Sequence, residues 1–203
     1  MPYSPDEFYA RALAHADEEG RLPTPPQSEW DIFPFELDSL RTRPLQPPVV
    51  PEPPRGGEGG ATCRRCEDPE KNVVWSDERW VLSAFGEPLG LPFGAALMPR
   101  AHLDLGDLDE RHAAELGVLT VRIDRAVDAL GGIGRMHVYK WGDGGAHLHL
   151  MFLARPEGLL QLRGSNLALW EEMLPRVPGT WRPPTSVRSR MRSPRPAAAP
   201  TSS

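Results

Sequence analysis

One short stretch of the chain has the alternating pattern of a β-strand. Residues 146–153 follow a glycine-rich turn and alternate between an apolar set and a set that contains a His-x-His pair. A period of two places successive side chains on opposite faces of a strand. The set expected to be buried is Ala146, Leu148, Leu150 and Phe152, and the opposite set is His147, His149, Met151 and Leu153. The two imidazoles would lie about 6–7 Å apart, close enough to serve one site. Two ordinary half-buried histidines are the alternative.

Other segments also have the composition of strands. Residues 73–75 and 80–82 are rich in Val and Trp and are separated by Ser-Asp-Glu, which predicts a hairpin. Residues 94–98 form an apolar run that ends at Pro99, because proline interrupts a strand. Residues 135–141 predict a strand that turns back through the glycines into the histidine strand.

Apolar residues at helical spacing predict one long helix and two shorter ones. The long helix covers residues 107–130, with Asp107 as its N-cap and a Gly-Gly pair at 131–132 as its end. Shorter helices are expected over 5–19 and 162–174. A helix and a sheet must each cover an apolar face, so we expect the long helix to pack on the apolar face of the histidine strand. The predicted fold class is therefore α+β, an antiparallel sheet with a long packing helix.

Composition divides the chain into four parts. Residues 1–43 combine the first helix with an arm of aromatic and apolar anchors, and residues 44–61 form a Pro- and Gly-rich linker. The folded domain is expected over 62–181, with the last helix inside it. Residues 182–203 are rich in Arg, Ser, Pro and Ala, which predicts a disordered tail. The anchors of the arm are Trp30, Ile32, Phe33 and Phe35.

Charge and hydropathy exclude two classes of partner. The chain of 203 residues has a formal net charge of -5 and a pI near 5.7, which gives no support for general nucleic-acid binding. No segment is apolar enough to span a membrane, and the first residues lack the basic and apolar regions of a signal peptide. We therefore expect a cytoplasmic protein.

The cysteines add candidate metal chemistry. Cys63 and Cys66 are the two cysteines of the chain, and their Cys-x-x-Cys spacing is a recurrent half of a tetrahedral zinc site. His102 and one of the strand histidines are the best candidates to complete it. A thioredoxin-like redox pair is a rival, but that motif follows a strand and starts a helix, whereas here it lies between a Gly-rich linker and a hairpin. Unliganded thiols are the third alternative.

The order of these motifs over residues 62–156 resembles the histidine triad superfamily, including its zinc-bearing branch related to galactose-1-phosphate uridylyltransferase. The matching pieces are Cys63-x-x-Cys66, the hairpin, the step Leu97-Met98-Pro99-Arg100-Ala101-His102, the helix opening Asp107-Leu108 and the strand motif His147-x-His149-x-Met151. The resemblance implies a HIT-like fold. It also implies a Zn²⁺ site whose ligands are Cys63, Cys66, His102 and His147. His149 would be the nucleophile that attacks the α-phosphorus of a nucleotide and forms a nucleotidyl-histidine intermediate.

Several other residues are candidates for substrate binding. Gly144 and Gly145 would let backbone amides approach phosphate oxygens, although glycine-rich turns are often only hairpin turns. Lys140 is a candidate phosphate contact, with a solvated strand-end lysine as the alternative. Arg163 lies at a loop–helix junction that suits phosphate, and a capping turn explains that junction equally well.

Two departures from the family pattern bear on activity. Met151 occupies the third triad position, where a His or Gln donates a hydrogen bond, and a thioether cannot donate. Loss of one such donor costs on the order of a hundredfold in rate. The strand 135–141 also lacks the Asn that family members place at the nucleotide, and Asp143 would repel phosphate.

Three functional classes follow. The first is a nucleotidyl hydrolase or nucleotidyltransferase that acts through His149. The second is a zinc-stabilised nucleotide-binding protein with weak or no catalysis because of Met151. The third is a redox protein that uses Cys63 and Cys66. The expected partner is a nucleotide or nucleoside-phosphate small molecule. Family members often form homodimers through this strand and helix, and coverage of that surface by the N-terminal arm is the alternative.

Overall fold

The computed structural model describes residues 10, 12–24, 26–29, 33–35, 43–44, 46–174, 176 and 185–191. The chain divides into two compact units, Met1–Pro53 and Pro54–Ser203. Its elements, in chain order, are η1 (Pro26–Glu29), α2 (Arg64–Glu67), β1 (Val73–Ser76), β2 (Trp80–Ala84), β3 (Phe93–Pro99), η3 (Leu105–Asp107), α3 (Glu110–Asp128), β4 (Ile133–Tyr139), β5 (Leu150–Pro156), η4 (Gly164–Asn166), α4 (Leu167–Met173) and α5 (Thr185–Met191).

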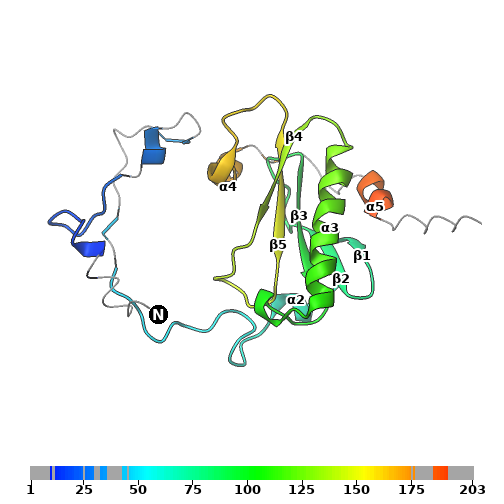
Figure 1. The fold of residues 1–203 in the computed structure, drawn as a ribbon, viewed down its shortest axis with the longest axis horizontal. Helices are drawn as coiled ribbons and strands as arrows, with labels where there is room; N and C mark the ends of the chain where they lie inside the picture. Colours follow the sequence, from blue (N-terminus) through cyan, green and yellow to red (C-terminus); the bar gives the residue numbers. More distant parts are fainter. Residues whose placement is uncertain are drawn as a thin grey trace, which may run out of the picture. The chain divides into compact units, whose positions relative to one another are not determined.

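The second unit is built on a five-stranded antiparallel sheet with the order β1-β2-β3-β5-β4 (Figure 1). The hairpin of β1 and β2 and the strand β3 lie where the apolar patterns predict them, and β4 begins and ends two residues earlier than the predicted strand over 135–141. Together with the long helix α3 they confirm the predicted α+β class.

The two faces of the sheet carry separate apolar clusters. Phe152 belongs to the main core, which also contains Leu119 and Ile123 of α3. Leu153, the next residue of β5, belongs to a smaller cluster with Leu167 of α4. Since neighbouring strand residues point to opposite faces, α3 covers one face and the α4 region covers part of the other. The predicted packing of the long helix on the Phe152 face is confirmed.

The histidine strand begins later than the sequence predicts. β5 starts at Leu150, so His147 and His149 lie in the segment that leads into it. The cause is the hydrogen bond that the Leu148 N–H donates to the Leu103 carbonyl, 2.7 Å long, because Leu103 lies in a loop and not in a strand. The alternation of faces still persists, since Leu148 is buried in the main core.

The start of the long helix also differs from the prediction. Its N-cap is Asp109, whose carboxylate accepts from the His112 N–H at 2.7 Å. The predicted cap, Asp107, instead ends the 3-10 turn η3 and closes a capping box with Asp104. Leu108 between them is extended, with φ -69° and ψ 127°, so the helix cannot include it.

The tail is ordered over one segment where the sequence predicts disorder. Thr185–Met191 form α5, whose Val187 and Met191 are fully buried in the main core that α3 also builds. Figure 1 shows α5 beside α3. Two apolar residues four positions apart lie on one helix face and can dock it, even within a polar composition.

The described residues of the first unit contain less helix than predicted, and residues 5–9 and 11 of the predicted helix lie outside the described residues. Among residues 10 and 12–20, helical residues end at Leu13 and are followed by turns, and Gly20 has a φ of 75°. The aromatic rings of Phe33 and Phe35 pack edge to face with centroids 6.0 Å apart. Trp30 and Ile32 of the predicted arm lie outside the described residues. In the part of the chain that the structure describes, no helix is long and apolar enough to cross a membrane.

Candidate metal centre and histidine pair

The four predicted metal ligands lie together. One nitrogen or sulfur atom from each of Cys63, Cys66, His102 and His147 lies within 4.8 Å of all the others. The Nδ1 atom of His147 is 3.5 Å from both sulfurs, and the Nδ1 atom of His102 is 3.4 Å from the Cys66 sulfur. Zinc–sulfur and zinc–nitrogen bonds of about 2.3 and 2.0–2.1 Å in a tetrahedron give sulfur–nitrogen edges of about 3.6 Å. The donor set therefore fits a tetrahedral zinc ion.

These ligands come from three places in the fold. Cys63 is the N-cap of the short helix α2 and Cys66 is its third residue, so one helical turn brings both sulfurs to the same side. His102 follows β3, which ends at Pro99. His147 lies before β5, and its ring is perpendicular to that of His102, with centroids 5.1 Å apart. Long-range folding, and not local sequence, closes the cluster.

Arg65, between the two cysteines, fastens α2 to its surroundings. Its guanidinium donates to the Pro69 carbonyl and to the Ser83 hydroxyl on β2, the latter at 3.2 Å. Burial lowers the pKa of Arg65, and the nearby carboxylates of Glu70 and Asp68 only partly oppose this shift. Arg65 thus holds the cysteine helix against the sheet.

His147 is fixed in the orientation that a metal ligand needs. Its Nε2 is 2.8 Å from the Pro99 carbonyl oxygen, which can only accept, so Nε2 carries the proton and Nδ1 faces the thiols with a lone pair. Such a hydrogen bond to the second ring nitrogen is the usual support of a ligating histidine. Burial lowers the pKa of His147 and so favours the neutral imidazole.

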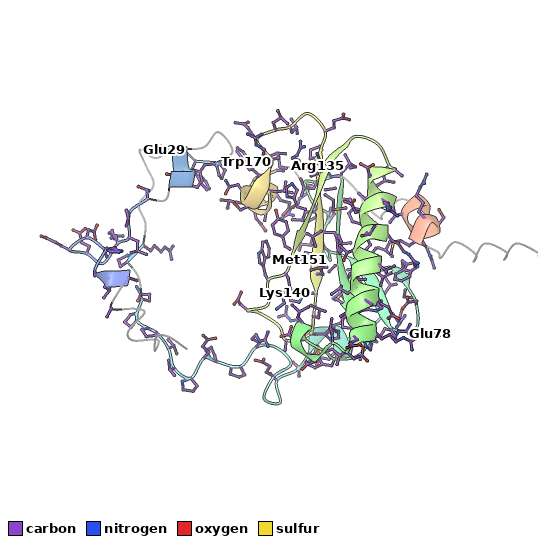
Figure 2. All side chains as sticks on the ribbon, in the orientation of Figure 1. Glu29, Glu78, Arg135, Lys140, Met151 and Trp170 are labelled. Carbon is purple, nitrogen blue, oxygen red and sulfur yellow. The ribbon has the colours of Figure 1, made fainter. Side chains whose placement is uncertain are left out.

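The ring of His149 is also oriented by a hydrogen bond to a backbone carbonyl. The Nδ1 atom of His149 is 2.9 Å from the His147 carbonyl oxygen, so Nδ1 donates the proton and Nε2 keeps its lone pair. His149 is half-buried. Met151 lies two residues further on, in β5 (Figure 2). Its partners across the sheet are Ala96 of β3 and Tyr139 of β4.

The residues predicted to contact phosphate interact with other residues of the chain. The ammonium of Lys140 lies 3.6 Å from the carboxylate of Asp104, which compensates part of its charge. The Gly144 carbonyl accepts from Gly56, and Gly145 forms a parallel bridge with the same residue. A side chain at Gly144 would meet nothing within 4 Å, so sterics do not require glycine there.

Arg163 lies in a different part of the structure. It is exposed and precedes the turn η4, whose Gly164 carbonyl accepts from the Tyr139 hydroxyl at 3.1 Å. The hydrogen bond ties this turn to β4, the strand that pairs with the one carrying Met151.

The sequence interpretation missed Arg55, which the composition had assigned to a linker. Its guanidinium donates to Asp104 at 2.8 Å, to the Gly142 carbonyl at 3.0 Å and to Glu58. A pocket of 360 Å³ lies beside these residues and reaches the predicted metal ligand His102. A single arginine in a Pro- and Gly-rich stretch carries no sequence signal that separates it from a solvated one.

Comparison with known proteins gives structural likenesses only. No family model and no curated protein matches the chain. Among solved structures, a HIT family hydrolase from Legionella pneumophila is 18% identical with a TM-score of 0.38, and the match covers 45% of this chain and 91% of that one. A zinc-bound histidine triad family protein from Mycobacterium smegmatis is 19% identical (TM-score 0.43, 64% and 92% covered). The chain is also similar to a histidine triad protein from Marinobacter aquaeolei, at 20% identity (TM-score 0.46, 59% and 85% covered).

Proposed function

We propose that this protein is a HIT-like nucleotide-binding protein that hydrolyses or transfers nucleotidyl groups through His149. The observation that carries the proposal is the contact between His149 Nδ1 and the His147 carbonyl oxygen. This contact leaves the Nε2 lone pair of a half-buried imidazole free to act as a nucleophile, which is the state that covalent catalysis needs.

The reaction that fits this residue has two steps. His149 Nε2 forms a bond to the α-phosphorus, and the bond between that phosphorus and the leaving group breaks with its electron pair going to the leaving group. Water or an acceptor hydroxyl then attacks the same phosphorus, restores the imidazole and releases the nucleotide. We assign phosphate binding to Lys140 and the turn at Gly144–Gly145, and we assign Met151 and the more distant Arg163 to binding the rest of the substrate.

We also propose that Cys63, Cys66, His102 and His147 hold Zn²⁺. Two thiols and two imidazoles are a common structural zinc set, and the sulfur–nitrogen distances of 3.4–3.5 Å suit it. Four protein ligands leave no open position, so the bound ion supplies stability and not Lewis-acid chemistry. Thiol ligands suit a reducing compartment, in line with the cytoplasmic location that we infer.

Covalent trapping tests the catalytic part. The protein is incubated with labelled nucleoside phosphoramidate, dinucleoside polyphosphate or sugar nucleotide, and acid-labile label on the protein is measured. We expect His149→Ala to abolish labelling while zinc content and melting temperature stay near those of the parent. His147→Ala should lower all three. Full turnover by His149→Ala would rule out the mechanism.

Met151 favours a second function, that of a zinc-stabilised nucleotide binder with little turnover. A thioether lacks the donor that would assist the leaving group. Nucleotide binding by calorimetry without any trapped label would select this alternative. A redox role for Cys63 and Cys66 would instead require a measurable thiol–disulfide couple in metal-free protein.

A homodimer is the assembly that we propose. β4 is an edge strand of the sheet, and it carries the exposed Val138. Val118 and Val121 of α3 are also exposed, with about half of each residue's surface accessible (50% and 47%). Analytical ultracentrifugation of the parent and of Val121→Asp would test this: a parent that sediments as a monomer contradicts it.

A further inference from the structure

The segment Pro54–Gly60 is bonded to the turn that precedes the two histidines. The Gly56 N–H donates to the Gly144 carbonyl at 3.2 Å, and the Gly56 carbonyl accepts from the Ala146 N–H at 3.0 Å. Arg55 adds a third bond, to the Gly142 carbonyl at 3.0 Å. Backbone bonds and a side chain therefore fix one short segment to both ends of the glycine turn.

The same segment touches the metal centre through a residue without a side chain. A Cβ atom at Gly57 would lie 2.6 Å from Cε1 and 3.1 Å from Nε2 of His102, and 3.4 Å from the Cβ of Cys63. The Nδ1 atom of the same ring, which is bonded to Cε1, faces the Cys66 sulfur at 3.4 Å. The backbone of Gly57 is therefore the surface against which the ring of His102 rests.

Gly57 leaves the His102 ring a space that no Cβ atom could share. Real Cβ atoms essentially never approach another atom to 2.6 Å, so any other residue at Gly57 would push the imidazole away. A ring on a free side chain could rotate at little cost. A ring that must also hold a metal cannot, because metal–ligand distances tolerate only about 0.2 Å.

Arg55 anchors the segment with charge. It pairs with Asp104 at 2.8 Å, and this carboxylate also lies 3.6 Å from the Lys140 ammonium. The Asp104 side chain is 23% exposed and that of Arg55 is 28% exposed, so the pair is partly shielded from water.

We infer that residues 55–57 are a positioning strap, in which Gly57 sets the His102 ring in the metal centre and Arg55 sets the glycine turn before His147. The inference rests on the proposed metal site. It adds that metal affinity depends on a residue that is not a ligand, and that the Pro- and Gly-rich stretch is part of the site.

A matched pair of glycine variants tests the role of Gly57. Gly57 and Gly60 both have a left-handed backbone, with φ of 92° and 86°, so alanine imposes similar backbone strain at each. A Cβ at Gly60 meets nothing within 4 Å, whereas one at Gly57 meets His102. We expect Gly57→Ala to weaken zinc binding about ten- to a hundredfold in chelator competition. Gly60→Ala should bind like the parent.

Cobalt binding separates a change in ligand geometry from a loss of stability, because a loss of stability alone would not change the spectrum of the bound ion. The absorption spectrum of the Co²⁺-loaded parent reports the ligand geometry, and Gly57→Ala should change it while Gly60→Ala should not. Equal affinities and spectra for the two variants, with the parent binding metal, would overturn the strap and leave the metal site standing. A parent that binds neither zinc nor cobalt would overturn the metal site itself.

The role of Arg55 is tested by amide hydrogen exchange. Arg55→Lys keeps the charge but cannot reach Asp104, Glu58 and the Gly142 carbonyl together. We expect faster exchange of the Ala146 amide, which bonds to the strap. The Leu148 amide, which bonds to Leu103, serves as the internal reference and should keep its protection. Unchanged protection of Ala146 would overturn this role.

Discussion

The Nδ1 atom of His149 lies 2.9 Å from the backbone carbonyl oxygen of His147. The two histidines therefore use their ring nitrogens in opposite ways. His147 donates from Nε2 to Pro99 and presents Nδ1 to the thiols, whereas His149 donates from Nδ1 and keeps Nε2 free. Two histidines separated by one residue are therefore oriented for different roles, His147 as a candidate metal ligand and His149 as a candidate nucleophile.

This relationship predicts the tautomer of His149. In neutral form the ring should carry its proton on Nδ1, since a carbonyl oxygen cannot donate to it. Long-range ¹H–¹⁵N correlation spectra of ring-labelled protein measure which nitrogen is protonated. A neutral His149 with its proton on Nε2 would contradict the geometry and the proposed nucleophile.

Restoring a donor at Met151 should raise turnover. Met151→Gln introduces an amide N–H two residues after His149, and one such donor is worth about a hundredfold in rate. Steady-state hydrolysis of a nucleoside phosphoramidate measures the effect. Met151→Leu is the control, because it changes shape without adding a donor and should leave the rate near that of the parent.

Metal removal should destabilise the fold. The four proposed ligands join α2, the loop after β3 and the segment before β5, so the ion would cross-link distant parts of the second unit. At free zinc 100- to 1,000-fold above Kd, binding adds about 3–4 kcal/mol to the unfolding free energy. Thermal melts with and without a chelator measure the loss. A chelator should have no effect on the Cys63→Ser, Cys66→Ser double variant.

Glu115 should make stability depend on pH. Its carboxylate accepts from Arg79 and, at 3.0 Å, from the Trp80 indole, and these bonds together with Arg111 lower its pKa from 4.5 to about 2, Arg79 being the main cause. A carboxyl with a depressed pKa stabilises the fold above pH 4.5, and this contribution disappears as pH falls toward 2.

The variant Glu115→Gln isolates this contribution. We expect it to lower the Tm by a few degrees at pH 7, because Arg79 loses its charged partner. The difference from the parent should shrink as pH falls from 5 to 2 in a series of thermal melts. A Tm difference that stays constant over this range would contradict the assignment.

The helix α5 should contribute to the core. Met191 is fully buried, and Met191→Ala should lower the unfolding free energy by about 2–5 kcal/mol in urea titrations. Arg190 on the same helix is exposed, and Arg190→Ala should change stability by no more than about 0.5 kcal/mol. Equal stability of Met191→Ala and the parent would show that α5 does not dock.

Local pattern was sufficient for much of the fold. The alternation around Phe152 identifies the buried face of its strand, and the apolar spacing between Leu119 and Val127 identifies the helix that covers it. Both signals depend on side chains a few residues apart, so the periodicity can be detected in a single sequence. The candidate metal chemistry could also be predicted from sequence, because the Cys63-x-x-Cys66 spacing restricts the chemistry that two thiols can perform.

Tertiary structure decided what depends on partners far away in the chain. Leu148 bonds to the Leu103 carbonyl, so β5 begins at Leu150 although the alternating pattern begins earlier. Arg55 donates hydrogen bonds to Asp104 and to the Gly142 carbonyl. These bonds place a Pro- and Gly-rich stretch beside the candidate metal centre. The amino-acid sequence shows which hydrogen-bond donors and acceptors each residue carries. Only the folded backbone selects which acceptor lies within 3 Å, because that choice is made by loop closure across 49 and 87 positions.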